Sequence, residues 1–255
     1  MQRHKFLKLL HERLRPRTYF EIGVRSGKSL TLSRVPSVGV DPYFALTHEL
    51  QCDLHLVRTT SDEFFARTHP FAHFERPLVD LAFIDGMHLA EYALRDFINT
   101  ERHCHPASVI VIDDVLPRTV DEGGRGRVGS AVKGAAWAGD VYKIIDVLRT
   151  RRPDLVLLEM DTSPTGTLVV LVPDAANTSL GEAYDDVVPE LVVPDPQAVP
   201  DWSLTRSRAI DPNALLDAAI WKEIREARER SFEEARGALS TAYVKAGLSA
   251  VRGNW

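Results

Sequence analysis

The chain of 255 residues has few cysteines, no long apolar run and no excess of positive charge. Its two cysteines are too few for a disulfide framework, so we expect a reduced, cytoplasmic location. No apolar run approaches the ~18 residues of a membrane-spanning helix, and the charged N-terminal stretch does not resemble a secretory signal. The formal net charge of −5 excludes a general basic field, so neither nucleic acid nor a membrane is an expected partner.

Hydrophobic residues make up 44% of the chain and charged residues 26%, which is ordinary for a globular protein. Composition divides the chain into a body over 1–173, a proline-rich linker or wrapping arm over 174–209, and a helical extension over 210–255. One long helix is predicted over 210–239, with Asp211 as its N-cap and Pro212 at its first position. We expect this helix to pack against the body. The alternatives are a homodimer contact or one wall of an acceptor pocket.

Within the body, short apolar runs alternate with helical patterns. Strands are predicted at 18–24, 37–41, 54–59, 78–85, 107–114, 154–160 and 166–172. Helices are predicted over 2–15, 88–103 and 137–152. A further helix is predicted to begin after the third strand, with Ser61 as its N-cap. This alternation indicates an α/β fold with a mostly parallel seven-stranded sheet, while the short turn between the last two strands predicts an antiparallel hairpin at one edge.

A glycine turn follows the first predicted strand, and an acid ends the second. Gly23 and Gly27 allow a tight turn and a close approach to a ligand. Asp41 lies where a carboxylate can accept hydrogen bonds from a ribose diol, because ligands bind at the carboxyl ends of parallel strands. The pair favours a nucleotide-like ligand over an ordinary surface turn.

Three ligand classes compete for this turn. A dinucleotide would favour a middle glycine that the chain lacks. A phosphate-binding P-loop needs one more residue between Gly23 and the Gly27-Lys28-Ser29 segment. S-adenosylmethionine carries no phosphate and needs only a glycine turn and an acid for its ribose, so it fits best. A P-loop-like nucleotide hydrolase stays as a remote alternative.

Acids also end the fourth and fifth predicted strands, at Asp85 and at Asp113 and Asp114. Neighbouring parallel strands bring these carboxylates together, where they repel each other unless a charge neutralises them. A hard divalent cation such as Mg²⁺, or Mn²⁺, does so with oxygen ligands. The alternative is a solvated acid cluster at the strand ends.

His88 follows Asp85 by three residues, so a sharp exit at Gly86 would bring the imidazole to the same edge. A neutral imidazole there can take a proton from a substrate hydroxyl. The glycine-rich stretch 118–134 predicts a mobile lid, in which Arg125 and Arg127 are acceptor contacts or, more simply, solvated charges.

Five segments together resemble the Rossmann-like S-adenosylmethionine-dependent methyltransferases, and more narrowly the metal-dependent O-methyltransferases that include enzymes acting on macrolide sugars. The matching segments are FEIGVRSGKSL (20–30), VGVDPY (38–43), FIDGMH (83–88), VIVIDDVLP (109–117) and WAGDVYK (137–143). The resemblance implies a doubly wound Rossmann-like fold. Catechol-type relatives commonly have Asn as the last metal ligand and Lys near the histidine position, so Asp114 and His88 favour the sugar-modifying branch.

The resemblance also implies the role of each site residue. His88 would be the general base, and Asp85, Asp113 and Asp114 would hold the metal. Asp140 and Lys143 would contact the acceptor, although Asp140 suits a helix start equally well. The implied cofactor-binding residues are Glu21, Gly23, Ser26, Gly27, Asp41, Ser61, Asp62 and Asp85.

The expected activity is therefore Mg²⁺-dependent methyl transfer from S-adenosylmethionine to a hydroxyl of a carbohydrate. The acceptor would be a deoxysugar of a natural product, a mannose-type oligosaccharide precursor or a similar small molecule. A catechol or phenol O-methyltransferase is the alternative within the class, and a cofactor-binding scaffold without turnover is the non-enzymatic one.

Overall fold

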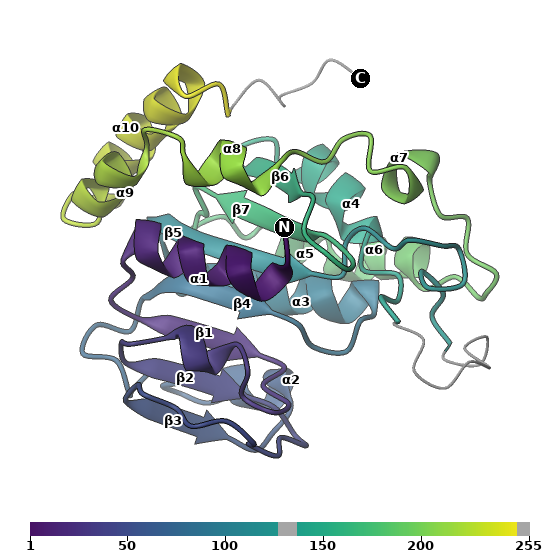
Figure 1. The fold of residues 1–255 in the computed structure, drawn as a ribbon, viewed down its shortest axis with the longest axis horizontal. Helices are drawn as coiled ribbons and strands as arrows, with labels where there is room; N and C mark the ends of the chain where they lie inside the picture. The colour runs from purple at the N-terminus through teal and green to yellow at the C-terminus, as the bar shows by residue number, and fades with distance from the viewer. Residues whose placement is uncertain (127–136, 249–255) are drawn as a thin grey trace.

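A seven-stranded sheet forms the centre of the protein (Figure 1). The computed structural model describes residues 1–126 and 137–248. The strands are β1 (Tyr19–Ile22), β2 (Ser37–Val40), β3 (Leu54–Val57), β4 (Val79–Ile84), β5 (Cys104–Asp113), β6 (Val156–Met160) and β7 (Thr167–Leu171). Their order is β3-β2-β1-β4-β5-β7-β6, and β7 pairs antiparallel with both β5 and β6. The predicted fold class, a mostly parallel Rossmann-like sheet with an antiparallel edge hairpin, is confirmed.

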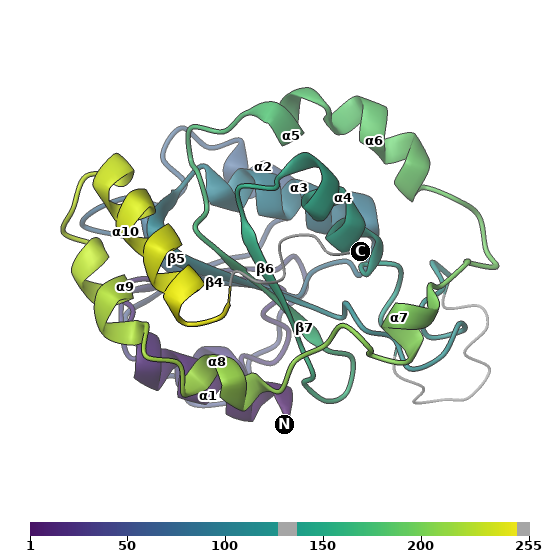
Figure 2. The same ribbon diagram turned by 90° about the horizontal axis from the view of Figure 1, so that it is seen from above.

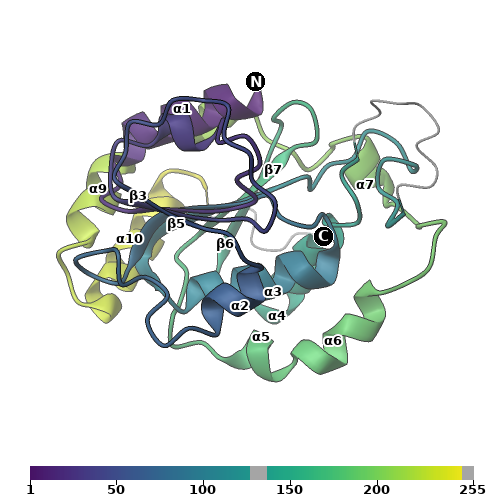
Figure 3. The same cartoon turned by 90° about the horizontal axis from the view of Figure 1, so that it is seen from below.

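One face of the sheet is covered by helices from the middle of the chain (Figures 2 and 3). These are α2 (Ser61–Phe65), α3 (Ala90–Glu101) and α4 (Lys143–Arg151), with α5 (Ser179–Glu182) and α6 (Tyr184–Leu191) packed outside α3. The apolar side chains of this face form one buried cluster with the inward residues of the strands. A further short helix, α7 (Asp201–Leu204), follows in the arm that leads back across the sheet edge.

The opposite face is covered by the two ends of the chain. Between β1 and β2 the chain has only the 3-10 helix η1 (Leu30–Leu32), and no helix separates β2 from β3. The N-terminal helix α1 (Arg3–Leu14) and the C-terminal helices α8 (Pro212–Leu216), α9 (Trp221–Ala227) and α10 (Phe232–Lys245) fill this face (Figure 2). Their apolar side chains share a second buried cluster with β4, β5 and β7. None of the helices in the two described ranges is long and apolar enough to span a bilayer.

The prediction of one long helix over 210–239 is wrong, because three shorter helices replace it. Asp211 caps α8 with Pro212 at its start, as predicted. The next break is a capping box: the Ser231 side chain accepts from the Glu234 backbone, and the Glu234 carboxylate accepts from the Ser231 backbone. These caps begin α8 and α10, and the breaks between the three helices let the segment bury its apolar side chains against the sheet.

Two other local predictions differ from the structure. The N-cap of α2 is Thr60 and not Ser61, because Thr60 forms the capping box with Glu63. The proline-rich segment 174–209 is not extended throughout, since it contains α5, α6 and α7. Val187 and Leu191 on α6 are buried against the first face. Because they lie one helical turn apart, a helix buries both on the same side.

If α10 is part of the core, shortening its inward side chain will cost more than shortening its outward one. Leu239 has an exposed fraction of 0%, whereas Val244 on the same helix has 62%. We expect Leu239→Ala to lower the free energy of unfolding by about 2–5 kcal/mol. Val244→Ala is the matched control and should change it by less than about 0.5 kcal/mol. Urea denaturation measures both, and equal effects would contradict the packing.

Candidate active site

The carboxyl ends of β4 and β5 bring three acids to one edge of the sheet. The strands pair in parallel, with Ile84 opposite Ile112, so the residues that follow them lie side by side. Asp85 follows β4, Asp113 is the last residue of β5, and Asp114 comes next. The parallel register of β4 and β5 therefore brings the three acids to one edge of the sheet, as the sequence predicts.

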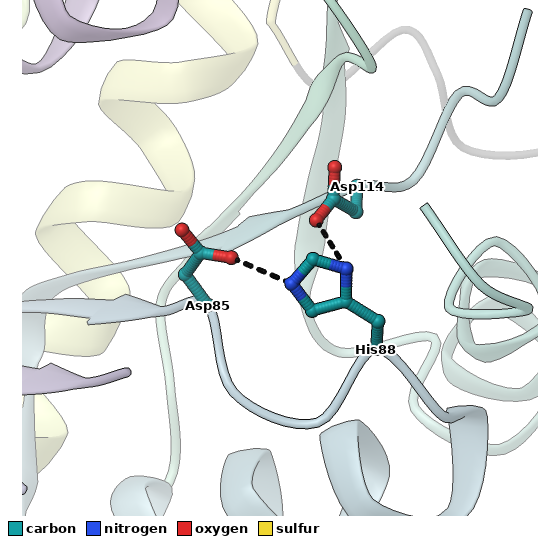
Figure 4. Close-up of side chains that lie close together, drawn as sticks. All are labelled: Asp85, His88 and Asp114. Atoms are coloured by element: carbon teal, nitrogen blue, oxygen red, sulfur yellow. Dashed lines mark hydrogen bonds and ion pairs between the residues drawn. The ribbon is translucent and has the colours of Figure 1, made fainter. Parts of the chain in front are cut away.

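His88 lies between two of the acids (Figure 4). Its Nε2 is 3.1 Å from Oδ1 of Asp85, and its Nδ1 is 3.0 Å from Oδ2 of Asp114. Nδ1 also lies 2.8 Å from the carbonyl oxygen of Trp137, which can only accept a hydrogen bond. The Trp137 ring stacks on the imidazole, with centroids 5.2 Å apart. The imidazole is therefore fixed on both edges and on one face.

The backbone at this site is held in an uncommon conformation. His88 has φ 58° and Asp114 has φ 64°, both in the left-handed region that costs energy for residues other than glycine. Two neighbours lie against these residues. The Thr165 hydroxyl donates to Oδ1 of Asp114, and Gly139 approaches the His88 carbonyl so closely that a Cβ would lie 1.7 Å from its oxygen. Two of the three residues whose side chains meet here, His88 and Asp114, thus have a left-handed backbone.

The surroundings of His88 favour its protonated form. Burial lowers the pKa of His88, but the hydrogen bond with Asp85 and the negative charges of Asp114 and Asp85 outweigh burial and raise it to about 9. A protonated imidazole cannot take a proton from a substrate. The role of general base therefore requires a positive charge that offsets the two carboxylates.

Asp113 points away from this cluster, toward helix α1. Its carboxylate, 1% exposed, forms an ion pair with Nη1 of Arg3, and the same Nη1 lies 3.3 Å from Oδ2 of Asp85. Residues that follow each other on a strand point to opposite faces, which separates Asp113 from Asp114. Among the described residues, the set whose ligand atoms lie within 4.8 Å of one another is Asp85, His88 and Asp114.

This set fits a divalent cation by its donor chemistry. Its two carboxylates offer the oxygen ligands that suit Mg²⁺ and Mn²⁺, whereas an imidazole is a ligand more typical of Zn²⁺ or iron. Asp113 contributes no atom to the set. The predicted metal role of Asp113 thus stays a prediction, and its present partner is Arg3.

The glycine turn lies directly beside the acids. A Cβ on Gly23, which has φ 91°, would lie 1.8 Å from the carbonyl oxygen of Asp85. Only glycine allows this approach between β1 and β4. Asp41 accepts hydrogen bonds from the backbone N–H of Arg25 (2.7 Å) and of Tyr43 (2.6 Å). Each of its oxygens has a second acceptor site, so binding of a ribose diol stays compatible with these contacts.

The loop after Asp41 folds back over the rest of the turn. The carbonyl oxygen of Ser26 accepts from the backbone N–H of Thr47 (3.1 Å), and Nδ1 of His48 lies 3.1 Å from the same oxygen. A Cβ on Gly27, at φ 80°, would lie 2.8 Å from Cδ2 of Leu46. Ser26 and Gly27 therefore lie at the predicted edge, with a loop packed on them.

Glu21 does not face this edge. It is fully buried, where Oε2 accepts from the hydroxyl of Tyr19 (2.6 Å) and Oε1 from that of Ser29 (2.7 Å). Burial raises the pKa of Glu21 to about 8, although these two hydrogen bonds act in the opposite direction. The carboxyl group joins β1 to the start of η1. The structure gives no support to the direct cofactor contact that was predicted for it.

Ser61 and Asp62 lie at the start of α2, beyond the end of β3. Oδ2 of Asp62 is 2.5 Å from Nη2 of Arg95 on α3. Ser61 hydrogen-bonds Asp96, whose pKa is raised to about 7 by burial. Both predicted adenine contacts are thus tied to α3 at the same end of the sheet, and their role toward a cofactor stays a prediction.

The two predicted acceptor contacts are used inside the protein. Asp140 has an exposed fraction of 0%, and its Oδ1 accepts from the backbone N–H of Ala90 at the start of α3. Its Oδ2 pairs with Arg125 and with Lys143, each at 2.8 Å. The Asp140 side chain therefore caps the start of α3, and not the start of the helix predicted over 137–152, which begins at Lys143. An acceptor contact by Asp140 or Lys143 has no support from these distances.

Part of the predicted lid is anchored in the structure. Arg125 is neither solvated nor free for an acceptor, because its guanidinium also binds Glu91, at 2.5 and 2.9 Å. The Asp195 carboxylate accepts from the backbone N–H of Arg125 (3.0 Å) and of Gly126 (2.9 Å). The rest of the lid prediction, including Arg127, lies outside the described residues.

Sequence reasoning missed three residues of the site. Arg3 belongs to an amphipathic helix that looks like any other, and Thr165 to an ordinary turn. Trp137 contributes its carbonyl and its ring, of which only the ring has a sequence signal. Arg3 and Thr165 belong to the site because each contacts one of its acids, Asp113 and Asp114. These contacts depend on where α1 and the β6–β7 hairpin lie against the sheet.

The buried carboxyl of Glu21 predicts a pH-dependent stability. Its pKa in the folded state is about 8 against an ordinary value of 4.5, so its contribution is present below pH 4.5 and is lost as the pH rises through 8. Glu21→Gln keeps a neutral group and does not titrate. From pH 5 to pH 9 the variant should gain at least about 1.4 kcal/mol in unfolding free energy relative to the wild type. Urea denaturation at both pH values measures the gain, and a pH-independent difference would contradict it.

Comparison with known proteins gives a match to a sequence family over part of the chain. Residues 20–115 match the sequence model of a family described as "Methyltransferase domain". No curated protein matches the chain. Solved structures with a similar fold include cofactor-bound Rv0187 from MTB, at 20% identity, 67% of this chain, 79% of that chain and a TM-score of 0.47.

Two further solved structures are O-methyltransferases. One is TomG from Streptomyces achromogenes, involved in tomaymycin synthesis and in complex with SAM, at 20% identity, 67% of this chain, 79% of that chain and a TM-score of 0.45. The other is from Bacillus cereus, in complex with SAH, at 16% identity, 66% of this chain, 80% of that chain and a TM-score of 0.44. The match to a methyltransferase domain thus covers residues 20–115, and this range holds Asp85, His88 and Asp114.

Proposed function

We propose that this enzyme transfers a methyl group from S-adenosylmethionine to a hydroxyl of a carbohydrate acceptor. His88 is the general base, and Asp85 and Asp114 hold a divalent cation, Mg²⁺ or Mn²⁺. The observation that carries this proposal is the imidazole fixed between two carboxylates, directly beside the glycine turn of a methyltransferase domain. A group that moves protons next to a cofactor turn suits transfer to a hydroxyl, which must lose its proton.

The turn itself favours S-adenosylmethionine over a nucleotide phosphate. Phosphates bind where the glycine loop leads into the N-terminus of an α-helix, whose free N–H groups hold the anion. Here Gly27 leads into η1, a 3-10 helix of three residues. That short element offers little of such an anion site, so the P-loop alternative loses its main support. The Asp41 carboxylate at the end of β2 suits the uncharged ribose instead.

In the proposed reaction Nε2 of His88 accepts the proton of the acceptor hydroxyl. In neutral His88 the remaining proton is on Nδ1, because Nδ1 donates to the Trp137 carbonyl at 2.8 Å. Nε2 is then the free acceptor, and it faces Asp85. The imidazolium that forms is stabilised by Asp85 on one edge and by Asp114 on the other. The methyl group moves to the acceptor oxygen, and the neutral thioether leaves without acid catalysis.

The charges at the site explain why a cation belongs to the proposal. Without one, Asp85 and Asp114 keep His88 protonated, and its base function is blocked. A bound divalent cation would offset these carboxylates, lower the pKa of an acceptor hydroxyl and orient it toward the methyl group. The identity of residues 88 and 114, which are histidine and aspartate, supports a carbohydrate over a catechol through the resemblance described above.

Release of S-adenosylhomocysteine tests the reaction. The enzyme is incubated with S-adenosylmethionine and either mono- and oligosaccharides or catechols and phenols, each with Mg²⁺ and with EDTA. We expect turnover on the saccharide pool that EDTA abolishes. Turnover confined to the phenolic pool would move the enzyme to the catechol-type branch, and turnover that survives EDTA would remove the metal from the proposal.

Replacement of His88 tests the base. His88→Ala should lower kcat about 10²–10⁴-fold, which is typical of a lost general base. S-adenosylmethionine binding, measured by isothermal titration calorimetry, should persist because the glycine turn is intact. The matched control is His69→Ala, which removes an exposed histidine from the loop after α2 and should leave kcat unchanged. If both variants turn over like the wild type, His88 is not the base.

A further inference from the structure

Arg3 inserts a positive charge into the acid cluster from the opposite face of the sheet. Its Nη1 lies against Oδ2 of Asp113 and 3.3 Å from Oδ2 of Asp85. The other oxygen of Asp85 is the one that faces His88. Asp85 is therefore shared between the guanidinium on one side and the imidazole on the other.

The backbone around Arg3 is fixed at the same edge. The N–H of Arg3 donates to the carbonyl of Ser163 (3.0 Å), and the N–H of Ser163 donates to the carbonyl of Met1 (2.7 Å). Two residues further along the same turn, Thr165 holds Asp114. One turn, between β6 and β7, thus positions both the guanidinium and the second acid of the cluster.

The side chain of Arg3 is held mainly by charge. Among the described residues its buried Nε has no hydrogen-bond partner, and the ring of Phe83 lies 5.8 Å from its Cζ. A guanidinium has five N–H donors, and the one on Nε is unused here. Attraction to Asp85 and Asp113 therefore dominates its placement, and a second cation would compete for the same oxygens.

We propose that Arg3 is an internal counter-cation that competes with a divalent cation for the acids at this edge, Asp85, Asp113 and Asp114. It neutralises Asp113 and one oxygen of Asp85, so it lowers the affinity of Asp85 and Asp114 for the metal. This inference rests on the cation site of the proposed function. Arg3 is a positioning residue in this scheme, because it acts on the metal through the carboxylates that it binds.

Direct titration with Mn²⁺, without cofactor or acceptor, tests this inference. The full chain is freed of metal with EDTA and dialysed, and binding is measured by electron paramagnetic resonance of free Mn²⁺. Arg3→Met, which removes the charge but keeps an apolar stem beside Phe83, should bind Mn²⁺ at least ten-fold more tightly, or about 1.4 kcal/mol. Arg3→Lys keeps the charge and should stay within about three-fold of the wild type, a smaller change in free energy.

The matched control is Lys5→Met, which removes one charge from an exposed position of the same helix. It should leave Mn²⁺ affinity unchanged. An equal gain in Lys5→Met would reduce the effect to net charge and overturn the inference. No gain in Arg3→Met, or no Mn²⁺ binding by it, would overturn it as well.

Arg3→Met leaves Asp113 buried without a partner, which can prevent folding. If far-ultraviolet circular dichroism shows that it does, Arg3→Met/Asp113→Asn is compared with Asp113→Asn, and the same ten-fold gain is expected; its absence overturns the inference. Methyl transfer by the wild type is assayed separately. EDTA-sensitive turnover together with an absent gain would leave the proposed function standing without the competition.

Discussion

Three carboxylates at the ends of two adjacent strands have to be neutralised, and the rest of the site depends on how this is done. Asp85, Asp113 and Asp114 meet because β4 and β5 pair in parallel register. Arg3 supplies one positive charge and a protonated His88 a second. These two cations leave one negative charge uncompensated. The site is therefore suited to a further cation, which the proposed chemistry includes.

The positive charge of Arg3 reaches this edge because α1 covers the second face of the sheet. Because the chain places only η1 between β1 and β2, the second face of the sheet is covered by α1 and by the C-terminal helices. Arg228 on the C-terminal side of α9 donates to the last carbonyls of α1, those of Leu14 and Arg15. This satisfies acceptors that a helix end otherwise leaves open. The C-terminal segment thus holds α1, and α1 carries Arg3 into the acid cluster.

The sequence predicts the parts of this arrangement that depend on local order. Apolar runs define the strands, their last residues define the edge, and the pair of Asp85 and His88 is found because the two lie three positions apart. Arg3 and Thr165 cannot be found in this way. Their roles come from contacts between segments that are far apart in the chain, and neither helix periodicity nor turn composition encodes which strand end they reach. The burial of Asp140 beside α3 could not be predicted for a related reason, since it depends on tertiary packing.

The adjacent acids Asp113 and Asp114 show why spacing alone misleads at a strand end. Along β5, Val109 and Val111 are buried with α1 and the C-terminal helices, whereas Ile110 and Ile112 are buried with α3 and α4. The same alternation places Asp113 toward Arg3 and Asp114 toward His88. Two consecutive acids therefore act on two faces, and each needs its own counter-charge. At this edge the second face already has one, Arg3, and in the proposed scheme a metal ion competes with it through Asp85, the carboxylate that both faces share.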